Sequence, residues 1–260
     1  MFPSGNREKK YAQVSQVNGG GLGRPALGGA IAARRRRRAC EEHRSRSWGL
    51  GGWRGVYDIL VKDGFTVSVV ANPDTGIAED VAATQRVLDR QTGPVILVGH
   101  SYGGVVITEA GVDPKVVGLV YIAAFAPDAG EAAGKFLPEG PQPFTPSKDG
   151  LLFMNRDAYL AAFAPDVPMH TRLFMADSQV PLAASTLSTP VTNPAWKTKP
   201  TWYLVSSNDQ IIPPDVERMY ARRMKATTHE VAGSHVAFIS HPEVAAHLIE
   251  EAAKGAGAAR

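Results

Sequence analysis

The sequence is poor in cysteine, with Cys40 as the only one among 260 residues. An intramolecular disulfide is therefore excluded, and so are metal sites built from several thiolates. The chain also lacks any run of 18 or more apolar residues, so we expect no membrane-spanning helix. Its stretch "ALGGAIAA" precedes a run of arginines, which is the reverse of the order in a secretory signal. We therefore expect a soluble, cytoplasmic protein.

Positive charge is concentrated at one end of the chain. Met1 to Trp53 holds 11 Lys/Arg and 3 Asp/Glu, whereas Arg54 to Arg260 holds 17 and 22. The run Arg34 to Arg38 would suit a phosphate-bearing or acidic partner, because clustered arginines gain affinity by releasing counterions. No aromatic pattern or fold motif accompanies the run, so we expect no nucleic-acid partner.

From Gly52 onward, strand-like and helix-like segments alternate. Such alternation predicts an α/β fold with a mostly parallel sheet flanked by helices, in one domain over 52–260. The expected strands, rich in β-branched residues, are Phe65 to Ala71, "PVILVG", "KVVGLVYIAAF", "TWYLVSS" and "THEVAG". The expected helices lie in "WRGVYDILVKDG", "GIAEDVAATQRVLDRQ", the stretch after Ser101, "PDVERMYARRMK" and residues 241–254.

Between Pro127 and Pro200 the alternation breaks down into proline-rich loops and short helix candidates such as "NRDAYLAAFA". An insertion of this length between two strands predicts a helical cap over about 127–200 rather than an unstructured loop. The apolar side chains of the cap are candidates for a substrate pocket, although packing of the cap on the sheet would explain them equally well. They are Phe136, Phe144, Leu151, Leu152, Phe153, Met154, Tyr159, Phe163 and Phe174.

Ser101 stands in a Gly-x-Ser-x-Gly pattern within "PVILVGHSYGGVVITEAG". The pattern by itself is common, and the alternative is a glycine-rich turn with an incidental serine. A strand directly before it and a helix directly after it are typical of a nucleophile elbow, the sharp turn that raises a serine hydroxyl above the sheet. Gly99 and Gly103 fit this interpretation because they carry no Cβ where the backbones crowd. We predict that Ser101 is a nucleophile.

A nucleophilic serine needs a base, and the base needs an orienting acid. His235 in "EVAGSHVAF" is the favoured base, since it lies in a loop between a short strand and the last helix. Asp209 directly follows a strand in "YLVSSNDQIIPP" and is the favoured acid, with Asp128 at the end of the preceding strand as the alternative. We interpret the remaining histidines of this part of the chain as packing or surface residues: His100, His170, His229, His241 and His247.

The stretches "PVILVGHSYGGVVITEAG", "VVGLVYIAAFAPDAGE", "PAWKTKPTWYLVSSNDQIIPP" and "AGSHVAFISHPEVAAHLI" resemble the α/β-hydrolase superfamily. More closely, they resemble its small bacterial esterase-like branch, akin to plant methylesterases and hydroxynitrile lyases. The similarity covers about Gly52 to Lys254. It implies the same triad of Ser101, Asp209 and His235, a backbone N–H of Tyr102 in the oxyanion hole, and no metal or organic cofactor.

The N-terminal segment departs from that branch. Its members begin with an apolar strand that runs into a His-Gly pair, which supplies the second oxyanion donor. Residues 1–51 are instead basic and rich in Gly and Arg, and hold no His-Gly pair, so the second donor is unknown. Either "YAQVSQV" or "ALGGAIAA" supplies the strand, although alanine and glycine are poor strand formers, or 1–51 is a disordered or wrong-frame segment.

We favour the second hypothesis because composition changes abruptly at Gly52, where the resemblance begins. It would leave an interior strand missing, at roughly 1–3 kcal/mol for each buried backbone group left unpaired.

These patterns predict a serine hydrolase that cleaves a small carboxylic ester or related acyl compound, with a small molecule as its partner. One alternative is a hydroxynitrile-lyase-like enzyme, which would need a polar cap residue such as Lys135 or Lys148 near the pocket. The other is a catalytically impaired binding module without a complete oxyanion hole. No pattern in the sequence indicates the oligomeric state.

Overall fold

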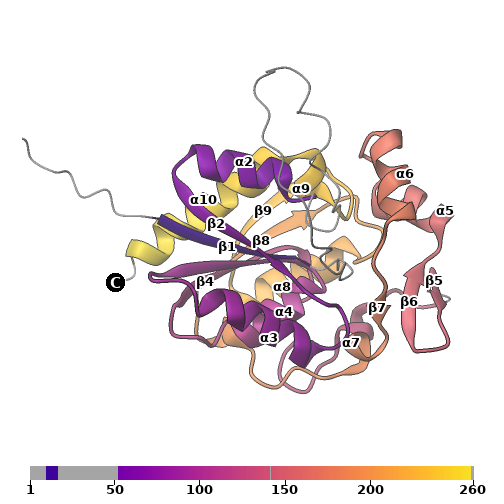
Figure 1. The fold of residues 1–260 in the computed structure, drawn as a ribbon, viewed down its shortest axis with the longest axis horizontal. Coiled ribbons are helices and arrows are strands. Elements are labelled where there is room, and N and C mark those ends of the chain that lie inside the picture. Colours follow the sequence, from indigo (N-terminus) through magenta and orange to yellow (C-terminus); the bar gives the residue numbers. More distant parts are fainter. Residues whose placement is uncertain (1–9, 17–51, 141, 259–260) are drawn as a thin grey trace, which may run out of the picture.

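The computed structural model describes residues 10–16, 52–140 and 142–258. Their largest element is a six-stranded sheet with the order β2-β1-β3-β4-β8-β9, in which all neighbouring strands are parallel. The predicted α/β fold is therefore confirmed (Figure 1). The strands are β1 (Lys10–Gln16), β2 (Phe65–Ala71), β3 (Val95–Ser101), β4 (Val116–Ala124), β8 (Thr201–Ser206) and β9 (Thr227–Val231).

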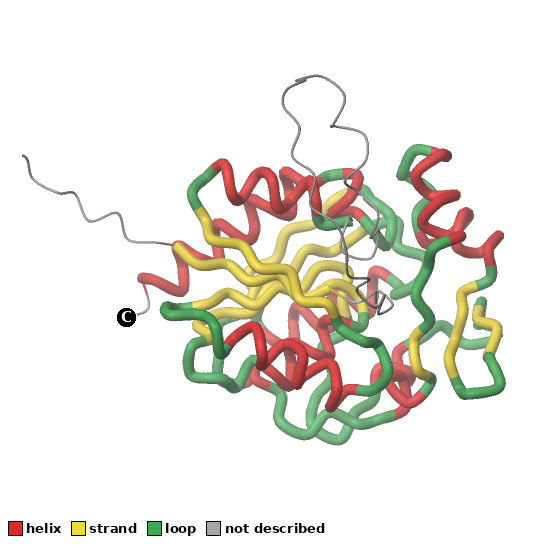
Figure 2. Tube along the Cα trace, in the orientation of Figure 1, coloured by secondary structure: helices red, strands yellow, loops and turns green. Residues whose placement is uncertain are grey.

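Helices cover both faces of this sheet, as Figures 1 and 2 show. One face carries α2 (Arg54–Lys62), α9 (Ala237–Ser240) and α10 (Pro242–Ala258). The other face carries α3 (Ile77–Leu88), α4 (Gly103–Ala110) and α8 (Pro214–Met224). From α2 onward, each main strand and helix lies where the sequence predicts it, apart from a few residues at the ends. None of the described helices is long and apolar enough to cross a membrane.

Strand β1 lies inside the sheet, between β2 and β3. Its register places Val14 beside Val69 on one side and Val98 on the other. The prediction that an interior strand is missing is therefore wrong, and the first alternative, the "YAQVSQV" segment, supplies it. Pairing with two neighbouring strands outweighs the modest strand propensity of this segment, and the penalty for unpaired ladder groups does not arise.

Several features noted in the sequence fall in residues 17–51, outside the described part of the chain. They are "ALGGAIAA", the run Arg34 to Arg38, and Cys40. A wrong-frame origin of this stretch stays a prediction.

The side chains of the central strands alternate between two hydrophobic cores. Ile96 and Val98 join the cluster under α2 and α10, whereas Val95 and Leu97 join the one under α4 and α8. Successive residues of a strand point to opposite faces of its sheet, so a strand covered on both sides is apolar at almost every position. This is the physical reason for the apolar run directly before Ser101.

The cap combines short helices with a second, antiparallel sheet of order β5-β6-β7. Its helical part agrees with the prediction from the sequence, but the sheet was not predicted, because strands of two to four residues carry too little periodicity to be recognised. The strands are β5 (Phe144–Pro146), β6 (Leu151–Met154) and β7 (Leu182–Ala183). The helical segments are η1 (Ala133–Phe136), α5 (Arg156–Ala158), the π-helical turn η2 (Tyr159–Phe163), α6 (Met169–Asp177), α7 (Ser185–Ser188) and η3 (Ala195–Lys197).

Candidate active site

Ser101 occupies a strained turn between β3 and α4. Its φ angle is +54°, in the left-handed region that residues other than glycine rarely adopt. The turn is possible because two glycines bring backbones together. A Cβ on Gly99 would lie 2.5 Å from the carbonyl oxygen of Gly103, and a Cβ on Gly104 would lie 2.1 Å from that of Phe125. The backbone therefore has the geometry of the elbow expected from the sequence.

The three residues singled out in the sequence meet at the carboxyl edge of the sheet. His235 Nε2 lies 2.9 Å from Ser101 Oγ, and His235 Nδ1 lies 2.6 Å from Asp209 Oδ2. They arrive there because β3, β8 and β9 are parallel, so the loops that follow them share one edge. His235 is fully buried and Asp209 is 5% exposed.

The hydrogen bonds around Asp209 fix its charge and the orientation of the imidazole. Asp209 Oδ1 accepts the backbone N–H groups of Ile211 and Ile212, at 2.6 and 3.0 Å. Burial by itself would raise the pKa of Asp209, but the charge of His235 and these hydrogen bonds outweigh it and hold the pKa below its ordinary value. With an ionised acceptor at Nδ1, that nitrogen of His235 donates, and Nε2 is left to accept the Ser101 proton.

Asp128, the alternative acid, lies elsewhere. Its carboxylate pairs with Lys197, and its backbone N–H donates to Glu131. The described histidines outside the Ser101 site also have other contacts. His229 pairs with Glu251, and His241 lies near Glu243.

His100 supports the site without belonging to the chain of hydrogen bonds. A backbone carbonyl can only accept, so His100 Nε2 must donate to His235 O, at 2.7 Å. Burial of His100 lowers its pKa to about 3, and the neighbouring His235 acts in the same direction. His100 is therefore neutral at pH 7 and holds the backbone of the residue that contacts Ser101.

Tyr102 follows Ser101 at the start of α4, so its backbone N–H has no intrahelical acceptor. Its side chain is anchored to α3, where the Tyr102 hydroxyl donates to Asp80 Oδ2 at 2.8 Å. Burial raises the pKa of Asp80 to about 6, against the lowering effect of this hydrogen bond. A second N–H beside that of Tyr102 is not identified in the described part of the chain.

A cap aspartate binds the loop that carries His235. Asp166 Oδ2 accepts the Ser234 N–H and the Ser240 hydroxyl, both at 2.8 Å, and Asp166 Oδ1 accepts the Ser234 hydroxyl. Burial would raise the pKa of Asp166, but these hydrogen bonds lower it below the ordinary value. Sequence reasoning missed this contact because nothing local links Asp166 to a serine 68 positions away.

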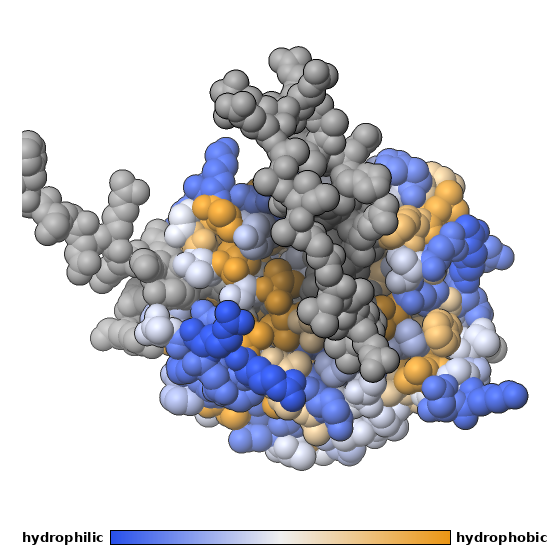
Figure 3. Space-filling view, in the orientation of Figure 1, coloured by the Kyte–Doolittle hydropathy of each residue, from blue (hydrophilic) through white to orange (hydrophobic). Residues whose placement is uncertain are grey.

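A cavity of about 90 Å³ opens beside Ser101, between the sheet edge and the cap. Of the cap side chains proposed from the sequence, five line it: Phe144, Leu152, Met154, Tyr159 and Phe163. Others do not: Phe136 packs on Tyr220, and Phe153 and Phe174 are partly exposed on the outer surface of the cap. Apolar side chains on this outer surface are visible in Figure 3.

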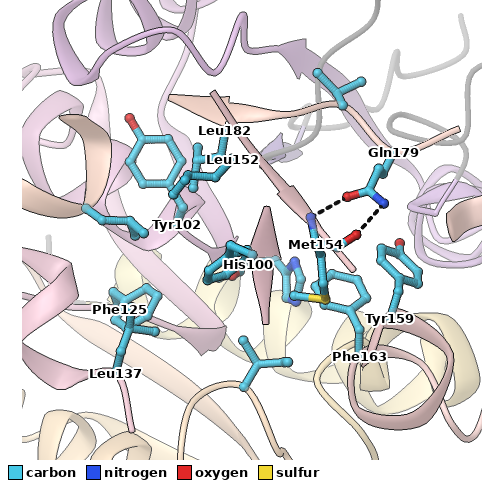
Figure 4. Close-up of a pocket in the computed structure, with 15 residues that line it drawn as sticks. His100, Tyr102, Phe125, Leu137, Leu152, Met154, Tyr159, Phe163, Gln179 and Leu182 are labelled. Carbon is cyan, nitrogen blue, oxygen red and sulfur yellow. Dashed lines mark hydrogen bonds between the residues drawn. The ribbon is translucent and has the colours of Figure 1, made fainter. Parts of the chain in front are cut away.

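Most polar side chains that line the cavity already have partners, among them Gln179, whose hydrogen bonds to Met154 are drawn in Figure 4. The side-chain amide of Gln179 binds the backbone N–H and C=O of Met154 and also the carbonyl of Ala176. Tyr159 is different, because no residue of the described chain pairs with its hydroxyl. Its ring packs on Phe163, which in turn packs edge-on against His235.

The described residues supply neither a cap lysine in the cavity, which a hydroxynitrile-lyase-like reaction would need, nor a cluster of metal ligands. Neither Lys135 nor Lys148 lines the cavity; Lys135 pairs with Glu131 instead. Within residues 10–16, 52–140 and 142–258, no three His, Cys, Asp or Glu side chains are grouped so that they could hold a metal ion.

Comparisons with known proteins agree with this geometry. A family model described as "Alpha/beta hydrolase family" matches residues 21–248. The "Alpha/beta hydrolase nvfD" of Aspergillus novofumigatus is 29% identical over 203 residues, which cover 70% of this chain and 80% of that protein. The "Carbendazim hydrolyzing esterase" of a Nocardioides species is 49% identical over a shorter stretch of 51 residues, or 19% of this chain and 21% of that protein.

Solved structures share the fold at low sequence identity. A pyrethroid hydrolase from Sphingobium faniae superimposes with a TM-score of 0.70 and 18% identity, over 95% of this chain and 97% of its own. The methylesterase MES16 from Arabidopsis superimposes with a TM-score of 0.67 and 15% identity, over 95% of this chain and 99% of its own.

Proposed function

Since this chain belongs to the alpha/beta hydrolase family, we propose that it is a serine esterase that cleaves a small, largely apolar carboxylic ester. The observation that carries the proposal is the unbroken chain of hydrogen bonds from Ser101 through His235 to Asp209. That order of groups suits acyl transfer, because the base is within reach of the nucleophile and is itself oriented by a buried anion.

The proposed reaction has two halves. In the first, His235 Nε2 takes the Ser101 proton as Oγ attacks the ester carbonyl, and the Tyr102 N–H donates to the oxyanion that forms. The imidazolium then returns the proton to the departing alkoxide, which leaves as the alcohol. In the second half, His235 deprotonates a water molecule, which attacks the acyl-enzyme and releases the carboxylic acid together with a restored Ser101 hydroxyl.

The cavity indicates the class of ester. Its volume of about 90 Å³ is smaller than the ~150 Å³ that holds a benzene ring, so a short acyl or alcohol group would occupy it. Its walls are mostly aliphatic and aromatic, and the Tyr159 hydroxyl, which has no partner among the described residues, can donate one hydrogen bond. We therefore infer a short ester that carries one hydrogen-bonding group. The relatives named as a carbendazim-hydrolysing esterase and a methylesterase support cleavage of this kind of bond.

The test is a series of p-nitrophenyl esters from acetyl to octanoyl, assayed with the wild type and with Ser101→Ala. We expect kcat/KM to fall with acyl length, and Ser101→Ala to lose at least about a thousandfold. Equal activity of the two proteins would refute the assignment of Ser101. Cyanide release from a cyanohydrin, with no ester cleavage, would show instead that the enzyme is a lyase.

A further inference from the structure

Glu217 is a fully buried carboxyl group that the proposed mechanism does not use. It lies in the first turn of α8, where a glutamate is ordinarily a solvated residue that favours the helix dipole. Its exposed fraction is nevertheless 0%. The burial follows from the position of α8, which packs against β8 directly beside the loop that carries Asp209.

Among the described residues, only one of the two carboxyl oxygens of Glu217 receives a hydrogen-bond donor. Its Oε2 accepts the backbone N–H of Ser206 at 3.0 Å. Its Oε1 receives no donor from the described residues, although it is completely shielded from solvent. The Asp209 carboxyl, which is itself an acceptor, acts on Glu217 through both its charge and its capacity for a hydrogen bond. The charge of Arg218 also acts on Glu217, but its guanidinium is paired with Glu230 and Asp215 on the outside of the helix.

Two carboxyl groups in contact inside a protein cannot both be ionised, because each would face an uncompensated like charge in a medium of low dielectric. The negative charge is better stabilised on Asp209, because its carboxylate accepts two backbone N–H groups and the imidazole of His235. Glu217 receives a single N–H. The proton therefore belongs on Glu217, and an Oε1 that carries it explains why that atom has no donor of its own.

We propose that Glu217 is a positioning residue, which remains protonated and donates a hydrogen bond from its carboxyl group to the Asp209 carboxylate. This role rests on the proposed function, in which Asp209 orients His235. In agreement with this protonated state, the pKa of Glu217 is raised well above its ordinary value. Burial is the larger cause and the charge of Asp209 the next. The buried Tyr203 also lies within the field of both carboxyl groups, and burial raises its pKa as well, so it stays neutral.

The hydrogen bond has a definite consequence for the site. It holds the Asp209 carboxylate in one orientation and stabilises its charge, which burial opposes. The carboxylate can then accept from His235 without drifting toward another partner. Glu217 touches neither the substrate nor the reacting atoms, so its effect would be seen in turnover and in the pH dependence of turnover rather than in substrate binding.

Two variants separate this role from simple packing. Glu217→Gln keeps the shape of a protonated carboxyl, because the amide oxygen accepts from Ser206 and the NH₂ group donates to Asp209. Glu217→Met keeps the approximate volume and removes the donor. For Glu217→Gln we expect kcat within about threefold of the wild type. For Glu217→Met we expect kcat to fall about tenfold, as for loss of one hydrogen bond to a charged group, with KM unchanged.

A second readout needs no substrate. The proton between His235 Nδ1 and Asp209 should give a low-field ¹H NMR signal in the wild type and in Glu217→Gln, and this signal should move further downfield in Glu217→Met, where the carboxylate is a stronger acceptor. The acidic limb of the kcat/KM profile should shift to higher pH in Glu217→Met, because an Asp209 that lacks its donor is more basic. Thermal unfolding of both variants serves as the control for folding.

The outcomes are distinct. If Glu217→Met matches the wild type in the NMR signal and the pH profile, or if Glu217→Gln is impaired as strongly as Glu217→Met, Glu217 does not act as a neutral donor. If the wild type shows the low-field signal but no ester cleavage that depends on Ser101, the proposed function fails while the role of Glu217 stands.

Discussion

Neutral, buried His100 makes the stability of this protein depend on pH in a specific way. In the folded state its pKa is about 3, whereas an exposed histidine has a pKa of 6.5. Between these values the unfolded chain binds a proton at this residue and the folded chain does not. Stability contributed by His100 is therefore fully present above pH 6.5 and is lost as the pH falls toward 3.

The magnitude follows from the linkage relation. Each pH unit below 6.5 removes about 1.4 kcal/mol, so at pH 5 the wild type should lose about 2 kcal/mol through His100 alone. Other groups also titrate in this range, and Asp80 acts in the opposite direction, because its raised pKa favours the folded state as the pH falls through about 6. A single pH series on the wild type would therefore not isolate His100.

The difference between the wild type and His100→Gln does isolate it. Glutamine does not titrate, and its amide can still donate to the carbonyl of His235. We expect urea unfolding at pH 7.5 to show the variant as less stable, and this deficit to shrink by about 2 kcal/mol at pH 5. A deficit that stays the same at both pH values would show that His100 is not held neutral inside the fold.

Three further variants probe the cap, the cavity and the elbow. Asp166→Ala removes two hydrogen bonds to Ser234 and one to Ser240 in α9, so we expect a loss of about 2 kcal/mol in urea unfolding. Asp177→Ala breaks only an exposed pair with a cap arginine and should lose less than about 1 kcal/mol. Equal losses in the two variants would contradict a stabilising role of Asp166. Tyr159→Phe should raise KM about tenfold for a short ester with a hydrogen-bond acceptor and leave its purely apolar analogue unchanged; equal changes in the two KM values would exclude a hydrogen bond from Tyr159. Gly104→Ala would place a Cβ 2.1 Å from the Phe125 oxygen, so we expect a loss of at least about 3 kcal/mol in thermal unfolding, and an unchanged Tm would show that the elbow is loosely packed.

The residues that the sequence predicts best are those whose surroundings are local. Ser101 follows a buried strand and precedes a helix, and both are visible in a dozen residues. Asp209 and His235 each lie in the loop that follows a strand, and parallel strands bring their ends to one edge. The resemblance to the α/β-hydrolase family and the expectation of a hydrolase enzyme are confirmed by the family model that matches residues 21–248, whereas the catalytic roles of the three residues stay predictions.

The features that escaped prediction depend on distant parts of the chain. The segment Lys10–Gln16 has a weak strand pattern, and its pairing is set by β2 and β3, which lie 50 or more positions further on. The contact of Asp166 with Ser234 and the burial of Glu217 beside Asp209 depend in the same way on tertiary packing. A glutamate in the first turn of a helix has an ordinary local explanation, so no sequence pattern distinguishes it from a solvated one.

The most direct test of the central claim is the site of reaction with a fluorophosphonate, which labels a serine only when base and oxyanion donors act together. Wild-type protein and His235→Ala would be labelled for matched times, digested, and mapped by mass spectrometry. We expect the label on Ser101 in the wild type, and a rate at least a hundredfold lower in His235→Ala. A label on another serine, or equal rates in the two proteins, would contradict the account of this site as a catalytic triad.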